Sequence, residues 1–130
     1  MNIEAWLARA DRALRSASLV RYSGDFNGAC SSAYYAMFYA ARAALIHVGQ
    51  AERAMGKTHS GMASAFSEFL VKPGLVDAKL RRDLSFELNR RILADYEEGG
   101  IDAEGAAEAI ASAQAFVAAV KVLIGRQQEK

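Results

Sequence analysis

The chain has 130 residues, and sixteen lysines and arginines against fifteen aspartates and glutamates give it a formal net charge of +1. This length fits one domain of about 100 to 150 residues, covering 1–130, and the near-neutral balance excludes a global field that would gather nucleic acid or anionic lipid. One cysteine and two histidines exclude an internal disulfide and a zinc finger, so we expect no metal and no cofactor.

Twenty-seven alanines and a single proline predict long helices whose ends are marked by glycines and capping residues. The first predicted helix covers residues 3–22, with an apolar stripe at three- and four-residue spacing. The second covers residues 26–48 and follows a Ser-Gly-Asp turn in which Asp25 is the expected N-cap. Because this second helix is apolar on every side, we expect it to lie at the centre of the fold or under a partner subunit.

Three more helices are predicted after a loop at residues 49–57, namely 58–71, 77–97 and 102–124. No segment alternates between apolar and polar residues with a period of two, so no strands are expected. Long helices joined by short loops predict an all-α fold, an antiparallel up-and-down bundle of four to five helices.

The lone cysteine favours a reducing compartment, and we expect a cytoplasmic protein that does not enter membranes. The longest stretch without a charged residue, 26–41, is sixteen residues long and contains polar side chains. That stretch is too short and too polar to span a bilayer.

The fourth predicted helix carries charged residues among its apolar positions. Glu87, Arg91 and Asp95 are four residues apart and fall within the stripe of Leu80, Leu84, Leu88 and Ile92. One interpretation is a ladder of i,i+4 ion pairs with a small structural effect. The other is that carboxylates hold the Arg91 guanidinium in a cleft, as phosphate recognition requires.

Two other segments allow both a structural and a functional interpretation. The turn Gly56-Lys57-Thr58-His59-Ser60-Gly61 precedes a helix, so Lys57 and Thr58 form a candidate anion site, although Thr58 or Ser60 can equally be an N-cap. The turn is not a Walker A loop, because Ala51 stands where its first glycine is required. Tyrosines on the second helix, Tyr35 among them, are either core residues or platforms for stacked bases.

Three blocks of sequence, taken together, resemble the HEPN domain family. They are the run SAYYAMFYAARAAL at residues 32–45, KTHSG at residues 57–61 and RILADYE at residues 91–97. The likeness extends over about residues 5–123. It implies a bundle of four to five helices that forms a homodimer with its active cleft at the dimer interface.

The resemblance also implies an activity. Many HEPN proteins are metal-independent endoribonucleases, often the toxin paired with a small nucleotidyltransferase antitoxin, and their cleft holds an arginine followed by a histidine. Arg91 matches that arginine, whereas Tyr96 stands five residues later where many members have histidine. The candidate catalytic residues are therefore Arg91, Asp95, Tyr96 and His59, with Lys57, Thr58 and Tyr35 as candidate nucleotide-binding residues.

The replacement of the histidine leaves a second interpretation open. The chain would then be a catalytically degenerate dimeric module that binds a nucleotide or a partner nucleotidyltransferase. In related toxin systems the partner modifies a tyrosine near this motif with AMP, and Tyr96 is the nearest candidate.

Overall fold

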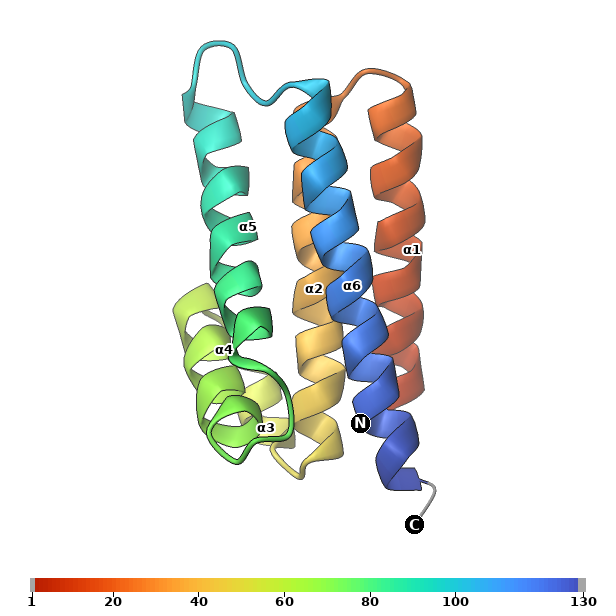
Figure 1. Ribbon diagram of the computed structural model, residues 1–130, viewed down its shortest axis with the longest axis vertical. Coiled ribbons are helices and arrows are strands. Elements are labelled where there is room, and N and C mark those ends of the chain that lie inside the picture. The colour runs from red at the N-terminus through yellow and green to blue at the C-terminus, as the bar shows by residue number, and fades with distance from the viewer. Residues whose placement is uncertain (1, 129–130) are drawn as a thin grey trace.

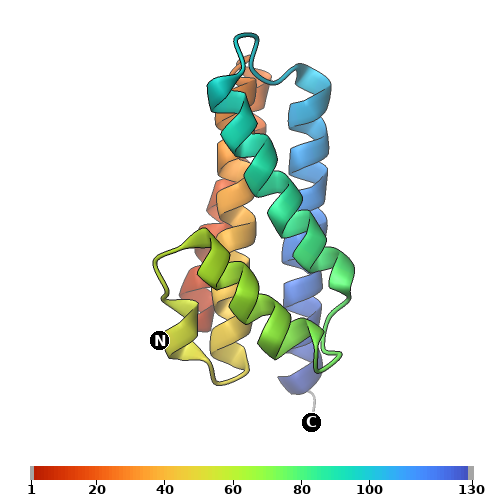
Figure 2. The ribbon, with the colours of Figure 1, turned by 90° about the vertical axis from the view of Figure 1, so that its left-hand side faces the viewer.

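The computed structural model describes residues 2–128. Four long helices run alternately up and down: α1 (Ile3–Tyr22), α2 (Phe26–His47), α5 (Ala78–Tyr96) and α6 (Ala103–Gln128) (Figure 1). Figure 2 shows that α5 crosses the bundle obliquely instead of lying parallel to its neighbours. No strand occurs in the described part of the chain, so the predicted all-α antiparallel bundle is confirmed.

The segment between α2 and α5 is more broken than predicted. The expected loop contains the one-turn helix α3 (Ala51–Ala54), and the expected helix 58–71 is divided into α4 (His59–Phe66) and a π-helical turn, η1 (Ser67–Val71). Alanines in the expected loop favour a helical turn, and residue-level propensity does not distinguish a π turn from an α turn.

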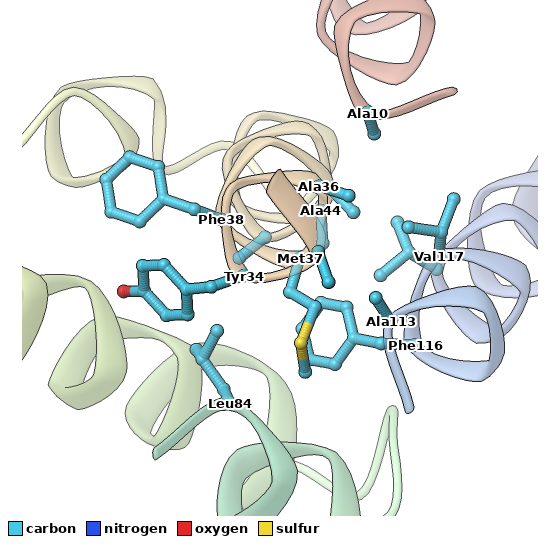
Figure 3. Packing of buried hydrophobic residues seen from close by; sticks show 14 of the residues in the cluster. Ala10, Tyr34, Ala36, Met37, Phe38, Ala44, Leu84, Ala113, Phe116 and Val117 are labelled. Atoms are coloured by element: carbon cyan, nitrogen blue, oxygen red, sulfur yellow. The ribbon is translucent and has the colours of Figure 1, made fainter. Parts of the chain in front are cut away.

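Helix α2 is the centre of the bundle and contacts every other element. Its buried positions are mainly alanines, and α1 presents Ala10 and Ala17 to it, both fully buried. Figure 3 shows α2 surrounded by Ala10 of α1, Leu84 of α5, and Phe116 and Val117 of α6. The expectation of a central α2 is confirmed, and small side chains let its neighbours approach closely.

The predicted heptad positions of the last helix form its buried face. All six are less than a tenth exposed: Ala106, Ile110, Ala113, Val117, Val120 and Ile124. By length and mean hydropathy this helix could also span a membrane, but the core helix of a soluble bundle meets the same test. Its packing against α1, α2 and α5 is that of a bundle helix.

Capping residues fix the helix ends near the site. The Asp25 carboxylate accepts a hydrogen bond from the Gly28 N–H, as expected for the N-cap of α2. In the first turn of α2, Asn27 donates to the carbonyl of Ala94 and accepts from the N–H of Ile101. The side chain of Asn27 thus ties both ends of the α5–α6 loop to α2 and fixes the position of α5.

Candidate functional site

Arg91 contacts α2 instead of the carboxylates on its own helix. Its Nε donates to the hydroxyl of Ser31 at 3.4 Å, and its guanidinium carbon lies 5.1 Å from the centre of the Tyr35 ring. Within residues 2–128 Arg91 forms no ion pair, which corrects the expectation that Glu87 and Asp95 hold it. A half-buried guanidinium with free N–H groups is suited to binding an anion.

Glu87 forms an ion pair with Arg90 in place of Arg91. Glu87 is only 3% exposed, and its Oε1 lies 3.0 Å from Arg90 Nε. Burial raises the pKa of Glu87, while the charge of Arg90 lowers it in part. Arg90 also donates to the Gly105 carbonyl and to Glu108, so this group joins α5 to α6.

The geometry of a helix explains the difference. A stripe of residues spaced by four rotates about 40° at each step, since each residue turns by about 100°. Leu84 is therefore buried, whereas Ile92 is 40% exposed. The true inward face uses three- as well as four-residue steps and includes Glu87 and Ala94.

His59, the first residue of α4, lies beside aromatic side chains of α2. Its Nδ1 is hydrogen-bonded to the Tyr34 hydroxyl at 2.7 Å, and its ring centre lies 6.4 Å from that of Tyr35. Tyr35 contacts both His59 and Arg91, so the structure brings these three predicted residues together. Figure 3 shows the Tyr34 hydroxyl pointing from α2 toward α4.

The pKa values of this cluster are shifted by burial and by Arg91. Burial first, and then the positive charge of Arg91, lower the pKa of His59 below its ordinary value of 6.5. Burial raises the pKa of Tyr34, so its phenol stays protonated at neutral pH. At neutral pH His59 is therefore mostly an uncharged imidazole, which can accept a proton.

The remaining predicted residues do not join this cluster through any contact in the described structure. The Thr58 hydroxyl accepts from the Gly61 N–H as the N-cap of α4, so the capping interpretation is confirmed, and Lys57 is exposed. Asp95 is exposed, and Tyr96 is 84% exposed at the end of α5. Tyr96 thus lies in solvent in the described structure.

A set of stacked cations next to the cluster was not predicted from the sequence. The guanidinium of Arg9 lies 4.8 Å from the ring centres of both Trp6 and Tyr39, and that of Arg42 lies 4.8 Å from Trp6. Arg9 and Trp6 belong to α1, whereas Tyr39 and Arg42 belong to α2. The sequence indicated only that Arg9 follows Trp6 by three residues on one helix. That Tyr39 and Arg42 of α2 lie against this pair is known only from the folded structure.

Among residues 2–128, no three histidine, cysteine, aspartate or glutamate side chains lie close enough together to hold a metal ion. Cys30 is buried, and burial raises the pKa of its thiol, so it is not an activated nucleophile. The groups available for chemistry are therefore an arginine, an imidazole and two phenols. They can bind a phosphate and move a proton.

Comparisons with known proteins find relatives that match most of the chain. The UPF0332 protein of Thermotoga maritima is 31% identical over 123 residues, which cover 94% of this chain and 90% of that protein. A UPF0332 protein of Gloeobacter violaceus is 35% identical over 88 residues, 68% of this chain and 67% of its own. A Methanocaldococcus jannaschii protein whose name describes it as a candidate toxin is 28% identical over 120 residues, 92% of this chain and 87% of its own.

The match to a family model extends over nearly the whole bundle. The model of the HEPN domain matches residues 3–123, from the first turn of α1 to the last turns of α6. This range includes Arg91, His59 and the tyrosines of α2. The chain belongs to the HEPN domain family.

Proposed function

We propose that this protein is the toxin-type component of a HEPN/nucleotidyltransferase pair and that it cleaves RNA as a metal-independent endoribonuclease. The toxin assignment is supported by two relatives from Methanocaldococcus jannaschii that are named as candidate toxins. The observation that carries the proposed activity is the convergence of Arg91 and His59 on Tyr35.

The chemistry follows from the imidazole and the guanidinium. His59 takes the proton of the RNA 2′-hydroxyl, and the 2′-oxygen then forms a bond to the adjacent phosphorus while the bond to the 5′-oxygen breaks. The leaving oxygen acquires a proton from water, and the products are a 2′,3′-cyclic phosphate and a 5′-hydroxyl end. Arg91 stabilises the negative charge that builds on the phosphate.

Neighbouring residues position these two groups. The hydrogen bond between Nδ1 of His59 and the Tyr34 hydroxyl fixes the imidazole ring. In the tautomer that carries its proton on Nδ1, Nε2 is the nitrogen that accepts a proton. Ser31 and the ring of Tyr35 hold Arg91 in place. In this arrangement the histidine comes from α4, and the family's usual position, Tyr96, does not supply the base.

The exposure of Tyr96 favours the second candidate function, a catalytically degenerate dimeric module. Its phenol is accessible at the end of α5, where a partner nucleotidyltransferase could bind it or transfer AMP to it. Under this alternative the cluster around Arg91 binds a nucleotide or the partner without cutting RNA.

A homodimer is part of the proposal, and we place its interface on the exposed face of α5. Phe86 and Leu93 are each more than half exposed there, although large apolar side chains are usually buried. Arg91 lies about 160° around the same helix from Leu93 and faces α2, so a second copy on this face would pack on α5 without covering Arg91. A second copy is the proposed occupant of the exposed apolar face.

We predict that Leu93→Glu makes the protein monomeric, because a charge at the centre of an apolar interface is not solvated when the interface closes. Light scattering after size exclusion measures the mass. Leu19→Glu is the matched control, since Leu19 is 70% exposed but lies on α1. A wild-type monomer, or equal dissociation by both variants, would contradict this interface.

The proposed activity predicts that purified protein cuts single-stranded RNA in the presence of EDTA. We expect His59→Ala to slow this cleavage by about 10²- to 10⁴-fold, the usual contribution of a positioned acid–base group. Single-turnover cleavage of a labelled RNA measures the rate, and mass spectrometry of the fragments identifies the cyclic phosphate.

His47→Gln is the control for this test, because it removes the other histidine of the chain, which ends α2 nine residues after Phe38, an α2 residue whose ring contacts His59. It should cut at the wild-type rate. If no RNA is cut under any condition while the protein still binds a nucleotide or a nucleotidyltransferase, the degenerate module replaces the ribonuclease.

A further inference from the structure

A polar groove runs between α1 and α2, next to the Arg91 cluster. Its volume is about 390 Å³, within the range of small-ligand sites. Arg9, Arg12 and Ser16 line it from α1, and Ser31, Ser32 and Tyr35 line it from α2, with Tyr39 beside Arg9. The proposed cleavage reaction uses only Ser31 and Tyr35 of this set, as supports for Arg91.

The groove has positive charge and no opposing acid in its lining. Within residues 2–128, neither Arg9 nor Arg12 forms an ion pair or a hydrogen bond to another protein group. The nearest acid in sequence, Asp11, is paired with Lys121 of α6 at 2.8 Å. Both guanidinium groups therefore have donors free for an anion.

Two aromatic rings restrict the side chain of Arg9. Its guanidinium carbon lies 4.8 Å from the ring centres of both Trp6 and Tyr39, and within residues 2–128 its N–H groups make no hydrogen bond, so they stay available. A cation held in this way loses little side-chain entropy on binding a phosphate. The serine hydroxyls beside it can donate further hydrogen bonds to phosphate or sugar oxygens.

The groove and the Arg91 cluster share two residues. Ser31 and Tyr35 line the groove and also contact Arg91, so the groove arginines and Arg91 are neighbours of the same two side chains. Two neighbouring anion sites fit a chain with successive phosphates better than they fit a single phosphate. Aromatic and arginine side chains along the track are the usual features of single-strand binding.

We propose that the α1–α2 groove binds the stretch of single-stranded RNA next to the phosphate held at Arg91, with Arg9 and Arg12 contacting backbone phosphates. This inference rests on the proposed function in assuming that RNA is the ligand of Arg91. It adds a binding track on a helix, α1, that contributes nothing to the chemistry.

The test measures binding of a short 2′-O-methyl oligouridine, which lacks the 2′-hydroxyl and so is not cleaved. Arg9→Gln/Arg12→Gln should weaken binding about 20-fold in 0.1 M salt. It should also reduce the slope of log affinity against log salt by about 1.4, or about 0.7 for each phosphate that the variant no longer neutralises. Fluorescence anisotropy across a salt series gives both quantities.

Arg15→Gln/Arg126→Gln is the matched control, because it removes the same charge from exposed positions that line other surfaces. It should leave the affinity within about twofold of wild type. Arg12→Gln alone removes no ion pair or hydrogen bond within the described residues, so it should not unfold the protein. If this single variant reduces the salt slope by about half as much as the double variant does, the loss of affinity does not come from unfolding.

Three results would overturn the proposal: equal effects of the two double variants, no binding of the oligouridine by wild type, or equally tight binding of uridine monophosphate or a polyglutamate peptide. Cleavage distinguishes this proposal from the ribonuclease assignment. If RNA is cut and the groove variant binds and cuts it as wild type does, the proposed RNA-binding groove is contradicted and the ribonuclease assignment is not affected. If the groove variant loses affinity for RNA but no RNA is cut under any condition, the RNA-binding groove is supported and the ribonuclease assignment is contradicted.

Discussion

Arg91→Ala should reduce metal-independent RNA cleavage by about 10³-fold or more, an effect on the rate comparable with that expected for His59→Ala. In the proposed mechanism Arg91 is the cation that contacts the scissile phosphate, and removing a preorganised positive donor to a transferring phosphoryl group has effects of this size. Single-turnover rates with saturating RNA separate this effect from weaker binding. Cleavage at the wild-type rate would remove Arg91 from the mechanism.

A second measurement on Arg91→Ala does not depend on cleavage. Because the charge of Arg91 lowers the pKa of His59, its removal should move that pKa upward, toward its ordinary value. NMR titration of the His59 ring reports the change. Arg82→Ala, at an exposed position of the same helix, should change neither the rate nor the pKa.

The sign of the effect on stability follows from the same shift. Since the pKa of His59 is depressed in the folded state, unfolding takes up a proton as the pH falls through the ordinary value, and the folded state loses stability on the acid side. With Arg91→Ala the depression is smaller, so this acid-side loss should also be smaller.

Phe116→Ala should lower the free energy of unfolding by about 3–5 kcal/mol, the largest expected effect on stability. The Phe116 ring is fully buried and packs on Phe66 at 5.4 Å between ring centres, where it joins α6 to α4. The alanines around it cannot fill the space that the ring leaves. Urea denaturation followed by circular dichroism measures the change.

Phe86→Ala is the control, because it removes the same side chain from a position that is 58% exposed on α5. We expect a change within about 0.5 kcal/mol in the monomer. Equal losses for the two variants would mean that the core drawn in Figure 3 does not hold the bundle together.

Sequence patterns predicted the long helices because their ends carry strong local signals. Asp25 and Asp77 cap α2 and α5 as expected, and Gly24, Gly74 and Gly100 adopt positive φ at the turns. N-capping and glycine turns depend on residues within three or four positions of one another, so the sequence predicts them without information on tertiary packing.

The partners of the site residues could not be predicted in this way. A helical wheel placed Arg91 among its own helix's carboxylates, but Ser31 and Tyr35 on another helix are its actual contacts. The stacking of Arg9 on Tyr39 likewise joins residues that are distant in sequence. Such contacts depend on how α1, α2 and α5 are rotated against each other, and a single periodicity does not fix that rotation.

The two halves of the site lie on parts of the fold with different resistance to local opening. Ser31, Tyr34 and Tyr35 belong to α2, which touches every other element and so can separate only when the whole bundle unfolds. His59 starts the eight-residue α4, in a segment of short elements between α2 and α5. That segment can detach at a smaller cost in free energy, so the His59 imidazole can move away from Tyr35 and Arg91 while the rest of the protein stays folded.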